Sequence, residues 1–548
     1  MSEAAHHQAT SVTERIRQYV RDLGSAGAAI LVLALVLRVL WLNLKPPHFD
    51  EGVNGWFVDE MMRQVFYRYD PSNFHGPLHF YILFVAQTLF GRAAWVLRLP
   101  IALISTACIA LALAFSRHLD RRACQIAALA MAVSPAMVFY GKYAIHETEL
   151  LFFLMLTTWG MAMLWREGTR SGLWAVGLGV TGMILTKETY AIHLVSLALA
   201  IPTLLLLEKV APSIPSARAI PSWRSRDLWL VAGVSLGLLV FFYSGGLLDS
   251  SALHGVWKTY THWVQTGTGG ETGHEKEWSY WLQLIGRYEW PAAAGFLAAF
   301  TLVKTGTNRL LRYLAIASAG TLVAYSIIAY KTPWCLIVLI WPFFFFFGYG
   351  VIRLATILDR SVVNTSAGIL CLLSLTACLQ LNFRNYTDES EPYVYVQTLP
   401  DINKLMRPLG ALTALDPTNY HLKGWIIMPD HHPMVWMLGD YTRVELRDTL
   451  QLPDEPDAAF LLIDDTIAEE LEGRMKETYF RETVLIRGNA EETSVLYLNE
   501  KTFGALFPTR TPEFIPGRSP TLKLLDLHAL PLDSLEESKS EEPITEQP

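Results

Sequence analysis

The sequence predicts a polytopic α-helical membrane protein that carries a small α/β domain outside the membrane. Its 548 residues are 52% hydrophobic and only 17% charged, whereas soluble domains carry about 25% charged residues. Several uncharged runs approach the roughly 20 residues that cross a hydrocarbon core. Basic residues cluster on one side of these runs, while acidic residues, histidines and tryptophans cluster on the other. No basic patch resembles a nucleic-acid footprint, so membrane lipids and not nucleic acid are expected as partners.

Hydropathy and charge together predict about eleven transmembrane helices. The expected spans are Ala26–Leu44, Leu97–Ser116, Ala123–Tyr140, Leu150–Trp165, Leu173–Thr186, Ala191–Leu207, Leu228–Leu248, Pro291–Val303, Tyr313–Tyr330, Leu336–Ile357 and Val363–Leu381. The short apolar stretch Leu78–Phe90 is interpreted as a juxtamembrane helix lying in the interface. A hairpin of two true spans is the competing interpretation of this region.

The basic residues orient the chain in the membrane. Arg15, Arg17 and Arg21 precede the first span, which places the N-terminus in the cytoplasm by the positive-inside rule. No small-residue cleavage site follows the first apolar run, so we expect an uncleaved anchor. The predicted location is therefore the inner (plasma) membrane, with the C-terminal domain periplasmic or extracellular.

Composition divides the chain into four parts. Residues 1–25 form a cytoplasmic segment, and residues 26–381 form a transmembrane domain with outer loops at 45–96 and 249–290. Residues 382–527 are expected to form the extracytoplasmic α/β domain, because β-like runs such as Phe460–Asp464 alternate with amphipathic segments. The acidic tail, 528–548, is expected to be disordered.

The first outer loop contains the most informative group of polar residues. Asp50 and Glu51 follow directly after the first span, and His75 and His79 stand four residues apart at the start of the short apolar helix. An acid at this place can simply cap a following amphipathic helix. It can also take a proton from a hydroxyl or amine.

Further ionisable residues stand at the outer ends of later spans. They are His146, Glu147, Glu149, Lys187, Glu188 and Lys331, and Trp334 accompanies the last of them. Ionisable groups at a membrane boundary are costly unless they line a polar cavity, although an interfacial collar is the simpler interpretation. Carboxylates, cations and aromatic rings on one face would suit an anionic, lipid-linked substrate, because Lys or His can hold a phosphate leaving group.

The ordered set of motifs resembles a known superfamily. Asp50-Glu51, His75-Gly76-Pro77-Leu78 and Arg98-Leu99-Pro100 are similar to motifs of the GT-C glycosyltransferases, in the branch of the protein mannosyltransferases and the lipid A aminoarabinose transferase. The stretches His146–Glu149, Lys187–Tyr190, Tyr330–Trp334 and Pro392–Thr398 resemble a subfamily that is labelled flippase-activity-associated. The resemblance covers roughly Ala26 to Thr398 and implies the GT-C fold.

The resemblance also implies a function and roles for individual residues. It implies transfer of a sugar from a polyprenyl-phosphate-linked donor to an acceptor on the outer face, where a lipid, a glycan or a protein can be the acceptor. Asp50 inherits the role of catalytic base with Glu51 beside it, and the Glu147/Glu149 region inherits an assisting acid. Lys187 and Lys331 become candidates for donor-phosphate contacts, with His75, His79, His146, Glu188 and Trp334 as further candidate binding residues.

The sequence leaves more than one alternative open for the cofactor and for the function. No cofactor is certain, although a divalent metal is possible. His75 and Gly76 stand where the aminoarabinose transferases carry Glu and Lys, so their metal and phosphate roles do not carry over. A flippase or transporter for a lipid-linked glycan, or a non-catalytic scaffold of a glycan pathway, are the competing functions. The acids lie at the outer face and not at the midplane, which disfavours the transporter.

Overall fold

The computed structural model describes residues 12–73, 75–214, 220–268, 273–304, 306–488 and 492–517, and the chain divides into two compact units. The first unit extends to Pro400 and also includes His432–Gly439. The second comprises Asp401–His431, Asp440–Ile486 and the chain from residue 492. The predicted disordered tail, 528–548, lies outside the described residues.

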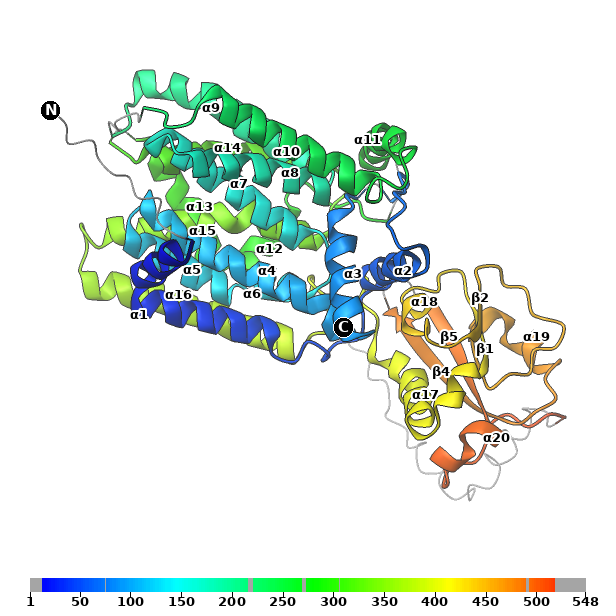
Figure 1. Cartoon of the computed structure of the whole chain (residues 1–548). Helices are drawn as coiled ribbons and strands as arrows, with labels where there is room; N and C mark the ends of the chain where they lie inside the picture. Colours follow the sequence, from blue (N-terminus) through cyan, green and yellow to red (C-terminus); the bar gives the residue numbers. More distant parts are fainter. Residues whose placement is uncertain are drawn as a thin grey trace, which may run out of the picture. The chain divides into compact units, whose positions relative to one another are not determined.

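The first unit is a bundle of α-helices (Figure 1). Its helices are α1 (Val12–Val39), α2 (Phe49–Gln64), α3 (Leu78–Phe90), α4 (Ala94–Ala114), α5 (Arg121–Val133), α6 (Pro135–Phe139), α7 (Glu147–Glu167), α8 (Arg170–Thr186), α9 (Tyr190–Val210), α10 (Ser225–Tyr243), α11 (Ala252–Thr268), α12 (Tyr280–Tyr288), α13 (Trp290–Ala299), α14 (Arg309–Ile327), α15 (Leu336–Leu354), α16 (Arg360–Phe383) and α18 (Met434–Met437). The long helices lie side by side, and the shorter α2, α3 and α11 lie at one end of the bundle (Figure 1).

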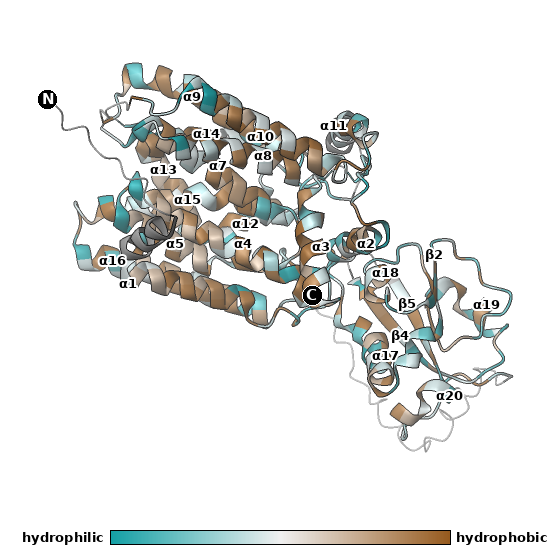
Figure 2. Ribbon diagram, in the orientation of Figure 1, coloured by the Kyte–Doolittle hydropathy of each residue, from teal (hydrophilic) through white to brown (hydrophobic). Residues whose placement is uncertain are grey.

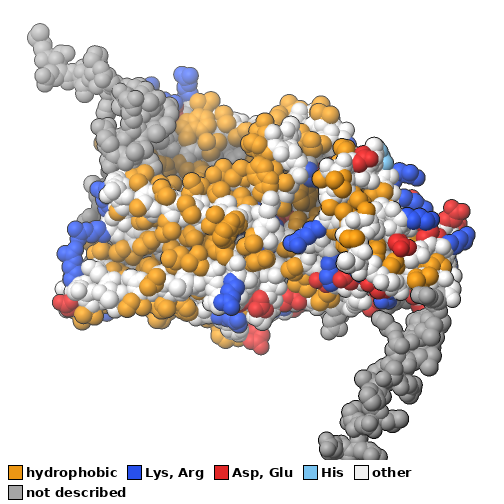
Figure 3. Space-filling view, turned by 90° about the horizontal axis from the view of Figure 1, so that it is seen from below, with side chains coloured by type: hydrophobic (Ala, Val, Ile, Leu, Met, Phe, Trp, Pro, Cys, Tyr) orange, Lys and Arg blue, Asp and Glu red, His pale blue; other side chains and the backbone are white. Residues whose placement is uncertain are grey.

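The predicted polytopic membrane fold is confirmed. Among the described residues, seven helices are long and apolar enough to cross a membrane, or eight if the bent pair formed by α5 and the following segment is one span. Three shorter apolar helices, Leu23–Val39, Leu78–Phe90 and Trp290–Val303, accompany them. The long helices are hydrophobic along most of their length (Figure 2), and a broad hydrophobic surface with Lys and Arg at its margins covers their flank (Figure 3).

Several element boundaries differ from the sequence prediction, among them the end of the first span and the helix expected at Leu173–Thr186. Helix α1 ends at Val39 instead of Leu44, because the chain turns at Trp41 with a left-handed φ of 53°. The expected span Leu173–Thr186 forms α8, which has 17 residues and is not one of the seven helices that are long and apolar enough to cross a membrane. The predicted short helix Leu78–Phe90 is confirmed with the same bounds as α3.

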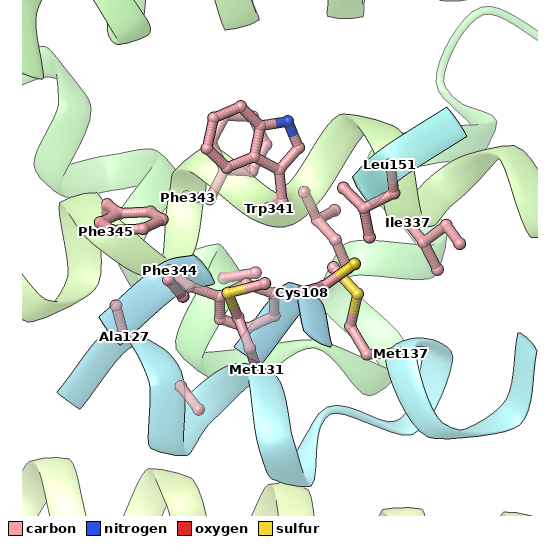
Figure 4. Close-up of a cluster of buried hydrophobic side chains, with 14 of the residues drawn as sticks. Cys108, Ala127, Met131, Met137, Leu151, Ile337, Trp341, Phe343, Phe344 and Phe345 are labelled. Carbon is pink, nitrogen blue, oxygen red and sulfur yellow. The ribbon is translucent and has the colours of Figure 1, made fainter. Parts of the chain in front are cut away.

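The core of the bundle is built around α15. Phe343, Phe344 and Phe345 are all buried and pack with Trp341 and Met131 (Figure 4). Helix α13 comes close to α15 at Gly295, where an added Cβ would collide with the carbonyl oxygen of Phe343. Close helix contact through small residues is typical of membrane bundles, because lipid offers no hydrophobic drive for association.

The break between α5 and α6 is held by two buried ionic side chains. The Arg38 guanidinium donates to the carbonyls of Met131 (3.2 Å) and Ala132 (3.1 Å) at the end of α5. The Glu289 carboxylate accepts hydrogen bonds from the Ala136 amide (2.8 Å) and the Ser134 hydroxyl (2.6 Å) at the start of α6. A guanidinium therefore meets a helix C-terminus and a carboxyl group meets the N-terminal end of the next helical segment, which is the order that the helix dipoles favour.

The second unit contains a five-stranded sheet in the order β2-β1-β3-β5-β4. The strands are β1 (Lys423–Ile427), β2 (Arg443–Arg447), β3 (Phe460–Asp464), β4 (Tyr479–Arg487) and β5 (Glu492–Asn499). Strand β1 pairs in parallel with β2 and β3, whereas β3 and β5 are antiparallel. Helices α17 (Asn403–Leu415), α19 (Ala468–Glu472) and α20 (Glu500–Phe503) accompany the sheet, in agreement with the predicted small α/β fold.

Candidate active site

Glu51 in the first turn of α2 and Arg98 of α4 form a buried, bidentate ion pair. Arg98 Nε lies 2.7 Å from Glu51 Oε1, and Arg98 Nη2 lies 2.5 Å from Glu51 Oε2. The same guanidinium donates to the carbonyls of Leu42 and Lys45, so it binds the chain that leads into α2. The Glu51 oxygens also accept the amides of His48 (2.8 Å) and Ala144 (2.9 Å). Burial opposes ionisation of Glu51, but Arg98 overcomes it and lowers the pKa of that carboxyl.

Asp50 differs from its neighbour because its side chain is 38% exposed. It stands in the first turn of α2, where the helix dipole favours a negative charge. The Asp50 amide donates to His48 Nδ1 (3.0 Å), and His48 Nε2 lies 2.8 Å from the carbonyl oxygen of Tyr395. His48 therefore carries its proton on Nε2. Of the two adjacent acids, Asp50 is the one whose carboxylate can reach a ligand.

Polar and aromatic side chains lie near Asp50. His274 and Tyr330 lie close enough to Asp50 to be influenced by its charge, and Tyr330 is also influenced by Lys187. The His274 ring is 5.0 Å from that of Tyr330, and its Nδ1 is 2.6 Å from the Tyr395 hydroxyl. Burial lowers the pKa of His274, although Asp50 opposes the shift.

The three predicted histidines lie together between two carboxylates. His75 Nδ1 is 2.9 Å from Glu188, and His79 Nδ1 is 3.0 Å from Glu149 Oε1. The His146 ring lies between them, 4.5 Å from His75 and 4.1 Å from His79. Burial, together with the neighbouring His79 and His75, lowers the pKa of His146 well below its ordinary value. His146 is thus held in its neutral form.

His79 contacts Glu149 with one ring nitrogen and the backbone with the other. His79 Nε2 faces the carbonyl oxygen of Ala144 at 3.2 Å and so must donate to it. Within the described part of the chain, Glu149 Oε2 and His146 Nε2 are buried without a hydrogen-bond partner.

Lys187 forms a buried ion pair with Glu147. Burial alone would lower the pKa of the Lys187 ammonium, but Glu147 raises it well above its ordinary value. His75 similarly outweighs burial and, with Lys187, holds the pKa of Glu188 below its ordinary value. The structure therefore places the predicted acids Glu147 and Glu149 in contact with predicted basic residues.

Lys331 and Trp334 lie next to residues that accompany Asp50, since the Lys331 amide donates to the His274 carbonyl and Trp334 contacts His48. Lys331 is buried, and its ammonium donates to the carbonyls of Lys276 (3.0 Å) and Ile328. Trp334 packs edge-to-face on His48, with ring centroids 5.6 Å apart. Lys331 thus anchors the backbone of the 276 region, while Trp334 contacts the histidine that orients the Asp50 amide.

Sequence reasoning missed three residues that accompany Asp50. They are Lys276, Tyr395 and the ion-pair partner Arg98. Lys276 is partly buried, lies 5.6 Å from the Tyr395 ring centroid and influences His274 electrostatically. Arg98 and Tyr395 belong to the motifs Arg98–Pro100 and Pro392–Thr398, which resemble motifs of known proteins. Lys276 belongs to no such motif. In the described residues, no group of three or more His, Cys, Asp or Glu side chains could hold a metal ion.

Fold and site define a polytopic helical membrane protein whose ionisable side chains meet at one end of the bundle, around the start of α2. The model of the family described as dolichyl-phosphate-mannose-protein mannosyltransferase matches residues 74–242. No curated protein sequence matches the chain.

Two solved structures of ArnT share the fold across nearly the whole chain. The apo structure of ArnT from Cupriavidus metallidurans aligns with a TM-score of 0.58 at 15% identity, over 90% of this chain and 99% of that one. The same protein bound to undecaprenyl phosphate gives 0.54 at 15% identity, over 89% and 98%. The oligosaccharyltransferase of Archaeoglobus fulgidus gives 0.46 at 10% identity, over 87% and 73%. The predicted resemblance to GT-C glycosyltransferases is confirmed in the family match and in the fold.

Proposed function

We propose that this protein is a glycosyltransferase that moves a sugar from a polyprenyl-phosphate-linked donor to an acceptor at the outer face of the membrane, with Asp50 as general base. The observation that carries the proposal is the division of roles between two adjacent acids. Glu51 is buried and bonded by Arg98, while Asp50 is 38% exposed at the start of α2. A fixed backbone with one accessible carboxylate is the arrangement that general-base catalysis needs.

The proposed reaction is a displacement at the anomeric carbon. Asp50 removes the proton from the acceptor hydroxyl or amine, and the acceptor atom forms a bond to that carbon. The bond between the anomeric carbon and the phosphate oxygen breaks, and the polyprenyl phosphate leaves with the electron pair. Lys276 is the proposed cation that binds the leaving phosphate, because both Lys276 and Asp50 act electrostatically on His274. Lys187, which the sequence suggested for this role, is already paired with Glu147.

An apolar groove supports a lipid-linked donor. It lies between α9 and α14, has a volume of about 460 Å³ and is lined by residues from Ala191 to Thr203 on α9 and from Ile316 to Ala324 on α14, with Trp263. Ala191 follows shortly after Lys187 and Glu188, so the groove begins beside the ionisable cluster. It offers a place for an isoprenoid chain whose phosphate would be at the site. ArnT, which shares the fold, has been crystallised with undecaprenyl phosphate.

The test is sugar transfer by the full-length protein in liposomes. Labelled polyprenyl-phosphate sugars are the donors, a cell-envelope extract supplies acceptors, and the readout is label that leaves the lipid. Asp50→Asn should lose at least about two orders of magnitude in rate. Glu60→Gln, an acid on the same helix α2, is the matched control and should keep its rate. Near-normal transfer by Asp50→Asn would overturn the base assignment, and movement of labelled lipid between leaflets without transfer would favour a flippase.

A further inference from the structure

A second pocket opens at the opposite end of the bundle from Asp50. It lies between α7, α9 and α14, has a volume of about 400 Å³ and is lined by the apolar side chains of Met161, Ala162, Leu204, Leu205, Leu310 and Tyr313. Helix α7 begins at Glu147 in the candidate site and ends at Glu167 beside this pocket. At about 1.5 Å per residue, that helix crosses roughly 30 Å, the thickness of a hydrocarbon core.

Two arginines stand at the mouth of this apolar pocket. Arg166 and Arg309 both line it, one from the last turn of α7 and the other from the first residue of α14. The Arg309 guanidinium lies 4.4 Å from the centroid of the Trp165 ring and pairs with Glu208 at 2.8 Å. Its Nε is buried and has no hydrogen-bond partner among the described residues.

Arg166 supplies a cation that forms no salt bridge with a carboxylate in the described ranges of the chain. Its one side-chain contact is a long hydrogen bond of 3.5 Å to Asn308 Oδ1, and within the described part of the chain no carboxylate forms a salt bridge with it. Glu208 balances Arg309, so the mouth of the pocket keeps about one unit of positive charge above an apolar interior. A basic pocket between transmembrane helices at a membrane surface is the arrangement that binds lipid head groups.

We propose that this pocket is a binding site for an anionic phospholipid of the leaflet opposite the candidate active site. The phosphate is held by Arg166 and Arg309 at the mouth of the pocket, and one acyl chain lies against Leu204, Leu205 and Leu310 inside it. Charge complementarity selects the anionic lipid, because a zwitterionic lipid would bring its own cation beside two guanidinium groups. The site is independent of sugar transfer, so its test does not depend on the proposed function.

Lipid binding to the purified full-length protein tests the proposal. Delipidated protein in a neutral detergent is titrated with phosphatidylglycerol, phosphatidylcholine or inorganic phosphate, and bound lipid is counted by native mass spectrometry. Arg166→Gln should weaken phosphatidylglycerol binding about fivefold, the loss expected for one basic residue at a lipid head group. Leu205→Trp should also weaken it, because Leu205 lines the pocket and is 49% exposed, so a larger ring fills the space without entering the core.

The control is Arg360→Gln. Arg360 is an exposed arginine at the start of α16 that does not line the pocket, so this variant should bind like the wild type. Equal binding of phosphatidylcholine and phosphatidylglycerol would overturn the proposal. Competition by inorganic phosphate together with unchanged lipid binding by Leu205→Trp would also overturn it, because that result describes a site for free anions. Equal losses of phosphatidylglycerol binding in Arg166→Gln and Arg360→Gln would overturn it as well.

Discussion

Arg98 binds both carboxylate oxygens of Glu51, at 2.7 and 2.5 Å, and both side chains are buried. The pair joins α4 to the first turn of α2 and, through the Ala144 amide, to the segment that precedes α7. Three pieces of chain that are distant in sequence therefore meet at one ion pair. Its position directly beside Asp50 makes it the support of the candidate active site.

Removal of one partner of this pair should be strongly destabilising. Arg98→Gln leaves Glu51 buried without its cation, which costs about 3–5 kcal/mol for buried pairs in general. We expect a clear fall in the thermal midpoint of the detergent-solubilised protein. Arg287→Gln is the control, because Arg287 is 51% exposed in its pair with Glu391, and such exposed pairs contribute about 0–1 kcal/mol. Equal midpoints for the two variants would contradict the supporting role.

The two adjacent acids should respond differently to removal of charge. Asp50→Asn should keep the wild-type thermal midpoint and lose transfer, because its carboxylate is half-exposed and makes few structural contacts. Glu51→Gln should lose both stability and transfer, because it weakens the bonds of Arg98. Parallel measurement of midpoint and transfer rate separates the two effects. A stable but inactive Glu51→Gln would indicate that Glu51 also has a chemical role.

The buried pair of Lys187 and Glu147 can be tested by a double-mutant cycle. Lys187→Met leaves the Glu147 charge uncompensated and should cost about 3–5 kcal/mol. Glu147→Gln added to Lys187→Met removes that charge, so the double variant should recover much of the lost thermal midpoint. If the double variant is as unstable as the sum of both single variants, the pair is not coupled as the structure indicates.

Glu289 should make stability depend on pH. Burial raises the pKa of Glu289 to about 7, although Ser134, Ala136 and Tyr393 donate hydrogen bonds to it. Between its ordinary value and about 7 the folded protein binds more protons at this site than the unfolded chain, so stability should fall as pH rises through that window. Glu289→Gln removes this titration.

The measurement is the thermal midpoint of wild type and Glu289→Gln across the same pH series. The thermal midpoint of Glu289→Gln should rise relative to that of the wild type as pH rises. The difference between the two midpoints should become constant above the pKa of Glu289. An unchanged difference across the series would show that Glu289 has the same protonation state in the folded and unfolded chain.

Much of the fold was predictable because bilayer physics leaves strong marks on a sequence. Leu78–Phe90 was predicted with the bounds that α3 has, and β3 was predicted as Phe460–Asp464. The predicted end of the first span was wrong by five residues, more than one helical turn, because Trp41 adopts a left-handed conformation that no local sequence pattern indicates. The expected span at Leu173–Thr186 forms the 17-residue α8, which is shorter than the seven helices that are long and apolar enough to cross a membrane.

The sequence by itself determined that this is a polytopic membrane protein and that acids, histidines and lysines accumulate at one end of its spans. Hydropathy and charge asymmetry are local properties, so they can be determined from the sequence without knowledge of tertiary contacts. Only the tertiary structure decided which of those side chains neutralise one another. Glu51 meets Arg98, Glu147 meets Lys187, and Asp50 is left half-exposed. Desolvation and ion pairing depend on distances between helices that are remote in sequence. These distances bury Glu51 against Arg98, where it stabilises the fold, and leave the adjacent Asp50 accessible.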